Sequence, residues 1–401
     1  MLTLSEFTGS APRRKALAIL SLGLAALIWL PLVHLLFASA STSYSSSKGV
    51  PLKAREMAKS QLGQWKDAST QAAEVRAMRR SNAEWDFMGR TFLVLSLAEM
   101  CFRDPALNRD YLTVIDRIVE ETLRAEREHG MHFFLMPYSR SAPFREQPER
   151  SLFIDGEIAC MAAARRMVEE NESHRTELKS RVRIIESRLR RSPFMAAESY
   201  PNECWLFDHA MALAAIRLSD HLEHEDHRAL MRDWVARARK NLIHAPTGLL
   251  CSSYTTEAGP LDGPEGSSLW LSAHCLRLVD ETLAREQYDL ARRWLERHFC
   301  GFAWSREWPV SWKGPTDIDS GAVIPILDIG AGASGLAFVG ASSFGDSALL
   351  QRLHTTVEFA AFPARKSGGL RYCASNPVGD SVILYSTVLG PMWNKVLQGP
   401  P

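Results

Sequence analysis

The sequence lacks an excess of charge of either sign. Its 401 residues include 47 lysines and arginines against 46 aspartates and glutamates, which leaves a formal net charge of +1. A protein that attracts nucleic acid through its overall field needs a clear positive excess. Nucleic acid is therefore not an expected partner. The length and a hydrophobic content of 46% are enough for one large domain or two ordinary ones.

Closely spaced cysteine pairs are also absent. The seven cysteines lie at positions 101, 160, 204, 251, 275, 300 and 373, and no two of them have the CxxC spacing of zinc and redox sites. Cys101, Cys160 and Cys275 lie inside apolar helical patterns, where cysteine acts as a small buried hydrophobe. The sequence predicts neither a metal site nor a cofactor.

Strand-like alternation is scarce, and helical periodicity takes its place. Charged amphipathic segments such as residues 178–191 alternate with segments that are apolar almost all round, such as 211–216 and 322–339. About twelve helices are expected, near residues 52–76, 82–102, 107–128, 152–170, 173–191, 204–222, 226–242, 267–281, 283–299, 320–342, 346–360 and 379–396. This alternation favours an all-α (α/α)6 toroid of six inner and six outer helices, although a helical solenoid and an irregular bundle show similar periodicity.

Long apolar runs are missing except at the N-terminus. Residues 16–38 carry no charge apart from a protonatable His34, and they are long enough to span a hydrocarbon core of roughly 30 Å. Because Arg13, Arg14 and Lys15 precede this run, residues 1–15 are expected in the cytoplasm and the bulk of the chain on the exported side of the cell membrane. A cleaved signal sequence, with Ala38-Ser39-Ala40 as its small-residue site, is the alternative. Residues 39–51 are expected to form a flexible linker and residues 52–401 the barrel domain.

The six predicted inner helices all begin with polar residues, near positions 82, 153, 204, 267, 320 and 379. Helix capping explains many of these side chains. Capping does not explain the surplus of acids, such as Asp155 with Glu157. In a toroid the inner helices run parallel, so these six ends should converge on one funnel for a small polar or amphipathic ligand.

Four residues of this funnel are candidate acid–base groups. Glu157 and Asp208 each lie in the first turn of an apolar helix and each has a nearer acid able to cap it, so they form the first pair. His209 and Asp86 are further candidates. The candidate substrate-binding residues are acids and aromatic side chains near the same ends: Asp155, Glu203, Trp205, Tyr254, Trp270, Trp312, Asp319 and Asp380.

Several local features resemble the linalool dehydratase-isomerase family. They are residues 199–228 with Pro201 and Asp220, the Thr247-Gly248 turn, the Ser253-Tyr254 loop and the Asp155-Gly156-Glu157 helix start. The resemblance implies an (α/α)6 barrel, often oligomeric, with a site between subunits and activity on a terpene alcohol. The family's catalytic pattern is not retained, because Ser199 and Asp208 stand where it has cysteines and Glu157 stands where it has a histidine.

Three classes of function follow. The first is a membrane-tethered lyase or isomerase that acts on a small amphipathic alcohol. The second is a carbohydrate-active hydrolase or lyase, which also uses paired acids and aromatic platforms. The third is a non-catalytic scaffold that binds a ligand or a partner in the funnel. A small-molecule substrate and the membrane are the expected partners, and a homo-oligomer is possible under the resemblance.

Overall fold

The computed structural model describes residues 11–46, 48–66, 68–316 and 321–399. Six inner helices form a closed ring, because each packs on the next along the chain and the last packs on the first. They are α5 (Ala83–Arg103), α7 (Leu152–Val168), α9 (Leu206–Glu223), α11 (Gly266–Leu276), α13 (Ala331–Ser343) and α15 (Pro377–Val388). The predicted all-α toroid is confirmed.

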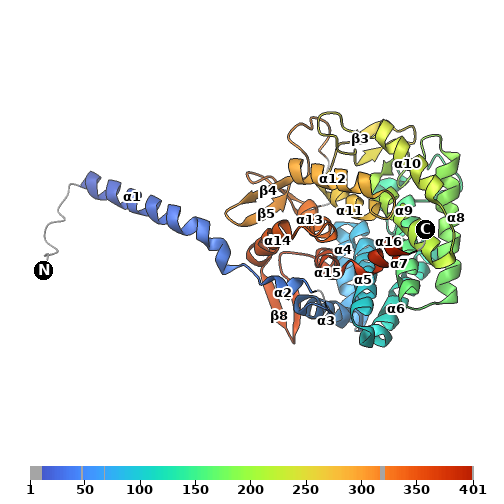
Figure 1. The fold of residues 1–401 in the computed structure, drawn as a ribbon, viewed down its shortest axis with the longest axis horizontal. Coiled ribbons are helices and arrows are strands. Elements are labelled where there is room, and N and C mark those ends of the chain that lie inside the picture. Colours follow the sequence, from blue (N-terminus) through green and yellow to red (C-terminus); the bar gives the residue numbers. More distant parts are fainter. Residues whose placement is uncertain (1–10, 47, 67, 317–320, 400–401) are drawn as a thin grey trace.

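A second layer of helices surrounds this ring (Figure 1). Its members bury one apolar stripe each and present arginines and glutamates outward, as expected of amphipathic helices on a core. They are α3 (Leu52–Lys66), α4 (Ala68–Ser81), α6 (Asn108–His129), α8 (Glu172–Arg191), α10 (Arg228–Asn241), α12 (Glu281–Trp294) and α14 (Ser347–Ala360), with the short α16 (Pro391–Gln398) at the end.

Small residues allow the inner helices to pack closely. At the contact of α7 with α9, a Cβ on Gly156 would lie 3.2–3.3 Å from atoms of Ala212. On α13, a Cβ on Gly340 would lie 2.9 Å from the Trp270 ring of α11. The alanine-rich and glycine-rich sequences of these helices are therefore needed for the ring to close at this radius.

Some predicted boundaries were wrong because short hairpins take the place of helix. The helix expected from residue 320 begins only at Ala331, after the pair β6 (Val323–Ile324) and β7 (Ile329–Gly330). The helix expected to reach residue 299 ends at Trp294 and is followed by the hairpin β4 (Glu296–Phe299) and β5 (Phe302–Ser305). The final predicted helix is broken by Gly390, with φ 128°, and Pro391.

Two further sets of short strands lie in loops. The dipeptides β1 (Cys204–Trp205) and β2 (Ser253–Tyr254) pair, and β2 also pairs with β3 (Pro260–Asp262). The hairpin β8 (Pro363–Lys366) and β9 (Gly369–Tyr372) precedes α15.

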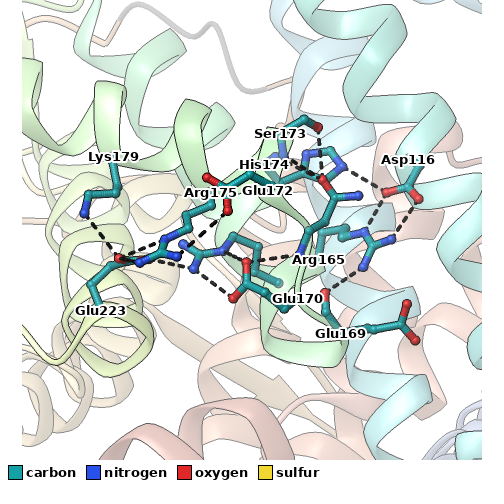
Figure 2. A network of polar contacts seen from close by, with 12 residues as sticks. Asp116, Arg165, Glu169, Glu170, Glu172, Ser173, His174, Arg175, Lys179 and Glu223 are labelled. Carbon is teal, nitrogen blue, oxygen red and sulfur yellow. Dashed lines mark hydrogen bonds and ion pairs between the residues drawn. The ribbon is translucent and has the colours of Figure 1, made fainter.

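An ionic network joins helices at the C-terminal ends of α7 and α9 (Figure 2). Glu223 at the end of α9 accepts hydrogen bonds from Arg166, Arg175 and Lys179, and Asp116 of α6 pairs with Arg165 and His174. Desolvation acts to raise the pKa of Glu223, but the hydrogen bonds from these cations outweigh it and lower that pKa to about 2. The network links the four consecutive helices α6 to α9 at the end of the ring where the inner helices α7 and α9 terminate.

The N-terminal apolar segment forms α1 (Ala11–Trp29) and the 3-10 helix η2 (Leu30–Leu36), with Pro12–Leu36 long and apolar enough to cross a membrane. The segment after it differs from the flexible linker that was expected. Ser41–Tyr44 forms α2, and the buried Tyr44 ring stacks on His354 of α14 at 3.8 Å between centroids. Because Tyr44, the aromatic residue among these serines, is buried in the core, this segment is attached to the domain.

Candidate functional site

A cavity of about 640 Å³ lies at the N-terminal ends of the inner helices. All six inner helices or the residues just before them contribute to its wall, so the helix starts converge on one cavity. Its acidic lining consists of Glu84, Asp208, Glu265 and Glu307, and its aromatic lining includes Trp85, Tyr138, Tyr200 and Trp205. Smaller polar side chains also line it: Ser267, Ser268, Ser334, Thr356, Ser375 and Asn376.

Aromatic side chains of the cavity wall hold two carboxylates, of which Glu84 lines the cavity and Glu203 is not among the described lining residues. Glu84 in the first turn of α5 accepts a hydrogen bond from the Tyr200 hydroxyl. The Tyr200 ring stacks on Tyr138, with 4.5 Å between centroids. The Tyr138 hydroxyl and the Trp205 indole N–H both donate to Glu203, which fixes the loop before α9.

Asp208 lies in the cavity wall at the start of α9, and its side chain is only 6% exposed. Burial raises the pKa of Asp208 well above its usual range, and the negative charges of Glu84 and Glu203 add to this effect. Asp208 is therefore protonated at a pH at which an ordinary aspartate is ionised. A protonated carboxyl in a cavity can donate a hydrogen bond or a proton to a ligand.

Glu157 lies behind this wall and is not among the described residues that line the cavity. Its Oε2 accepts a hydrogen bond of 2.7 Å from Thr91, while its Oε1 is buried without a hydrogen-bond partner in the described part of the chain. Burial raises the pKa of Glu157, and the charges of Asp208 and Glu84 raise it further. Glu157, Asp208 and Glu84 thus form one electrostatically coupled group.

Tyr254 is electrostatically coupled to the same group through Asp208. Its ring is buried, its hydroxyl has no hydrogen-bond partner among the described residues, and the charge of Asp208 contributes to the raised pKa of its phenol. Two unpaired buried polar atoms beside one carboxyl, Glu157 Oε1 and the Tyr254 hydroxyl, are uncommon in a folded protein and often mark a functional region.

The opposite side of the cavity is mostly apolar, although the hydroxyl residues Ser334 and Thr356 also line it. Leu336 and Phe338 of α13, Leu353 and Val357 of α14, and Val382 of α15 line it. Between the two sides, Glu307 accepts hydrogen bonds from the Ser267 backbone N–H at 2.9 Å and from its hydroxyl, so this carboxylate caps α11. The cavity therefore suits a ligand with one polar end and one apolar end.

Two of the candidate acid–base and binding residues, Asp86 and Asp155, occupy other places. Asp86 points away from the cavity and pairs with Arg90 at 2.9 Å and Arg79 at 3.5 Å. Asp155 pairs with Arg150 and Arg181 and borders a separate hollow of about 360 Å³. Both follow from helix geometry, since a residue two positions along a helix lies on nearly the opposite face.

His209 uses both ring nitrogens on backbone groups. Its Nδ1–H donates to the Trp205 carbonyl at 2.8 Å, and its Nε2 accepts from the Ala197 N–H at 3.0 Å. Burial lowers the pKa of His209 to about 4, so the ring is neutral and ties a loop to α9.

Three further candidates, Trp270, Trp312 and Asp380, do not line the cavity. Trp270 donates to Ser305 at 2.8 Å within the core, and Trp312 donates to the Pro315 carbonyl at 2.7 Å in its own loop. Asp380 accepts from the Tyr372 N–H, and burial raises its pKa to about 7. Asp319 lies outside the described residues.

The sequence predicted that the helix starts that contain Glu84 and Glu265 converge on one funnel. It did not single out Glu84, Glu265, Glu307 or Tyr200 as site residues. Glu84 could have been chosen over Asp86 by noting that Arg90 lies four residues after Asp86 on the same helix face. Glu307 and Tyr200 belong to loops, and no periodic pattern places a loop residue in a helical ring.

A metal ion has one candidate grouping among the described residues. Carboxylate and imidazole atoms of Asp220, Glu225 and His227 lie within 4.8 Å of one another. Asp220 also accepts the His227 backbone N–H at 3.1 Å, which joins the end of α9 to the start of α10. This grouping lies at the opposite end of α9 from Asp208, and its contacts are those of a helix connection.

No protein-family model and no curated protein matches the chain. Among solved structures, the chain is similar to a GH76 alpha-mannanase from Bacteroides thetaiotaomicron, with 10% sequence identity, a TM-score of 0.48, and coverage of 78% of this chain and 87% of that chain. A likeness of this size carries no argument, and the fold assignment rests on the closed ring of helices. The linalool dehydratase-isomerase resemblance stays a prediction, since none of these comparisons shows that family.

Proposed function

We propose that the chain is a membrane-tethered lyase or isomerase of the linalool dehydratase-isomerase type, which acts on a small amphipathic alcohol in the cavity. The observation that carries this proposal is the division of the cavity into an acidic side around Asp208 and a mostly apolar side formed by α13, α14 and α15. A sugar would leave the apolar side unused, whereas an alcohol with a hydrocarbon body fills both sides.

Dehydration of such an alcohol needs an acid and a base. In this proposal Asp208, protonated by its environment, gives its proton to the leaving hydroxyl, which departs as water. Glu84, held by Tyr200, then accepts a proton from the neighbouring carbon, and the carbon–carbon double bond forms from that C–H pair of electrons. Glu157 acts through Asp208 as a positioning residue, because it is enclosed behind the wall.

Membrane attachment belongs to the same proposal. The described helix Pro12–Leu36 has the length and hydropathy of a span, and its basic N-terminal flank favours a cytoplasmic start with the barrel on the exported side. A cleaved signal sequence would give the same barrel without the tether.

The aromatic lining favours a second candidate, a carbohydrate-active hydrolase or lyase. Trp85, Trp205 and the stacked pair Tyr138 and Tyr200 lie beside the carboxylates, as sugar-binding platforms do in glycosidases. The products distinguish the two candidates. A lyase or isomerase would form an alkene or an isomerised alcohol, whereas a carbohydrate-active enzyme would form new reducing or unsaturated sugar ends.

The experiment is turnover by the full chain in detergent with two panels, short tertiary and allylic alcohols and a set of oligosaccharides. Asp208→Asn should lower turnover by roughly 10²–10⁴-fold, the usual contribution of a positioned acid. Glu99→Gln is the matched control, because Glu99 is also a buried carboxyl of raised pKa but does not line the cavity. Loss of activity in both variants, or in neither, would contradict the role of Asp208. Ligand binding without turnover in either panel would point to the scaffold.

A further inference from the structure

Large apolar side chains are exposed on one side of the domain, around three neighbouring segments. Phe299 at the tip of the β4–β5 hairpin and Phe362 after α14 are each 65% exposed, and Ile326 in the β6–β7 turn is fully exposed. Leu327 and Phe359 in the same segments are about half exposed, at 52% and 48%. We call these five residues the apolar rim. Isolated exposed apolar residues are normal, but a group of this kind marks a surface of interaction.

Contacts between the segments show that the rim is continuous. The ring of Phe302 on β5 lies 5.3 Å from that of Phe359 on α14. The Trp304 indole of β5 donates to the Leu327 carbonyl at 3.0 Å, which holds the β6–β7 turn against the β4–β5 hairpin. The three segments therefore present their apolar side chains as one surface.

The rim adjoins the foot of the helix that could span a membrane. Phe37, the residue after η2, places its ring 5.0 Å from Phe359, and His34 of η2 lies against Phe302 and Gly301. No spacer separates the apolar helix from the rim, and the buried Tyr44 fixes the following segment to α14. Figure 1 shows α1 leaving the domain on the side of β4, β5, α14 and β8. A bilayer that contains this helix reaches the rim directly.

The cavity is open toward the same side. Five of its exposed lining residues lie on or beside the β6–β7 hairpin, at the start of α13, at the end of α14 and before α15: Ala322, Ile324, Ala331, Ala360 and Ala374. The sixth, Tyr138, lies beside Tyr200 on the acidic side. Ala360 is the neighbour of Phe359, and Ile324 belongs to the same turn as Ile326. The apolar side of the cavity and the apolar rim are therefore adjacent surfaces.

We infer that the apolar rim lies in the interfacial layer of the lipid bilayer and that the cavity takes a lipid-soluble amphipathic ligand directly from the membrane. The inference rests on the proposed function in two respects: the membrane tether and the amphipathic character of the ligand. Aromatic and aliphatic side chains at the foot of a spanning helix are stabilised in this layer, because it accepts apolar surface while its headgroups remain hydrated.

Photocrosslinking in the full chain tests the position of the rim without requiring turnover. Benzoyl-phenylalanine would replace Phe299, Ile326 or Phe362 in protein reconstituted into phosphatidylcholine–phosphatidylglycerol vesicles. Leu261 on β3 and Leu397 on α16 are matched controls, since they are 37% and 40% exposed apolar residues on other elements. Lipid adducts at the rim should exceed those at the controls several-fold. Equal labelling at all five positions, or adducts of the rim with a second copy of the chain, would overturn the inference.

A second probe tests entry into the cavity. A medium-chain alcohol carrying a diazirine, dissolved in the same vesicles, should label peptides that contain Leu336 and Val382. Label confined to α1 would contradict entry from the bilayer. Both readouts are independent of the chemistry, so an inactive Asp208→Asn variant that still labels would leave this inference standing, and an active enzyme in detergent that fails to label would overturn this inference alone.

Discussion

At the scale of single residues, the sequence predicted which helix ends carry the acids but not which acid faces inward. Glu84 and Asp86 differ by two positions in one helix turn, and only Glu84 lines the cavity. The choice is decided by Arg79 and Arg90, which hold Asp86 on the outer side. The same holds for Asp155, which Arg150 and Arg181 hold away from the cavity. Arginine partners four to thirty residues away are visible in a sequence only after the fold is known.

Glu99 gives a prediction about the pH dependence of stability. This fully buried carboxyl accepts the Gly390 and Met392 N–H groups, each at 3.0 Å, and burial raises its pKa to about 7 despite these bonds. The folded state therefore holds an extra proton between about pH 4.5 and 7, so the free energy of unfolding falls as pH rises through this range, by roughly 3 kcal/mol from this group.

The measurement is chemical denaturation of the wild type and of Glu99→Gln at several values between pH 5 and 8. The variant should show a clearly flatter pH dependence, whatever its absolute stability, because glutamine cannot ionise. Asp116 and Glu223, whose pKa values are about 2, act only at lower pH, and Asp380, whose pKa burial also raises to about 7, contributes to the slope of both proteins alike. Identical slopes would show that Glu99 is not the titrating group.

At the scale of elements, the helices followed from periodicity and the short hairpins did not. The strands β6, β7, β4 and β5 are two to four residues long, and their pairing is fixed by contacts with α13 and α14 rather than by their own sequence. Tertiary packing overrides local preference in segments this short. These unpredicted hairpins carry Ile326 and Phe299, so the apolar rim could not be derived from sequence.

The contact of α7 with α9 gives a prediction with an internal control. Gly156→Ala places a Cβ 3.2–3.3 Å from Ala212, including its backbone, where the neighbour cannot move easily, so the variant should be destabilised by about 1–3 kcal/mol. Gly63→Ala in α3 meets nothing within 4 Å and should stabilise the protein by about 0.5–1 kcal/mol through helix propensity. Thermal denaturation of both variants gives the comparison. A neutral or stabilising Gly156→Ala would show that the ring has room at this contact.

At the scale of the whole molecule, the alternation of apolar and amphipathic helices favoured the toroid without excluding a solenoid or an irregular bundle, and the convergence of six helix starts was expected from the toroid. The pattern could not predict that one side of the cavity is acidic and the other mostly apolar, because this depends on which helices contribute apolar residues to the lining. The acidic side comes from α5 and α9 and the apolar side from α13, α14 and α15. The tether also differed from expectation, because Tyr44 anchors it to α14.

The central claim is that Asp208 works as a protonated acid in this cavity, and the pH profile of kcat/KM tests it most directly. Burial and the nearby carboxylates raise the pKa of Asp208, so activity should be retained above the pH at which an ordinary aspartate ionises and should fall as pH rises through that raised pKa, where the proton is lost. The residual activity of Asp208→Asn should lack this alkaline fall, whereas Glu99→Gln should keep it. An alkaline fall of the same midpoint in Asp208→Asn, or wild-type activity that rises with pH across the neutral range, would contradict the account.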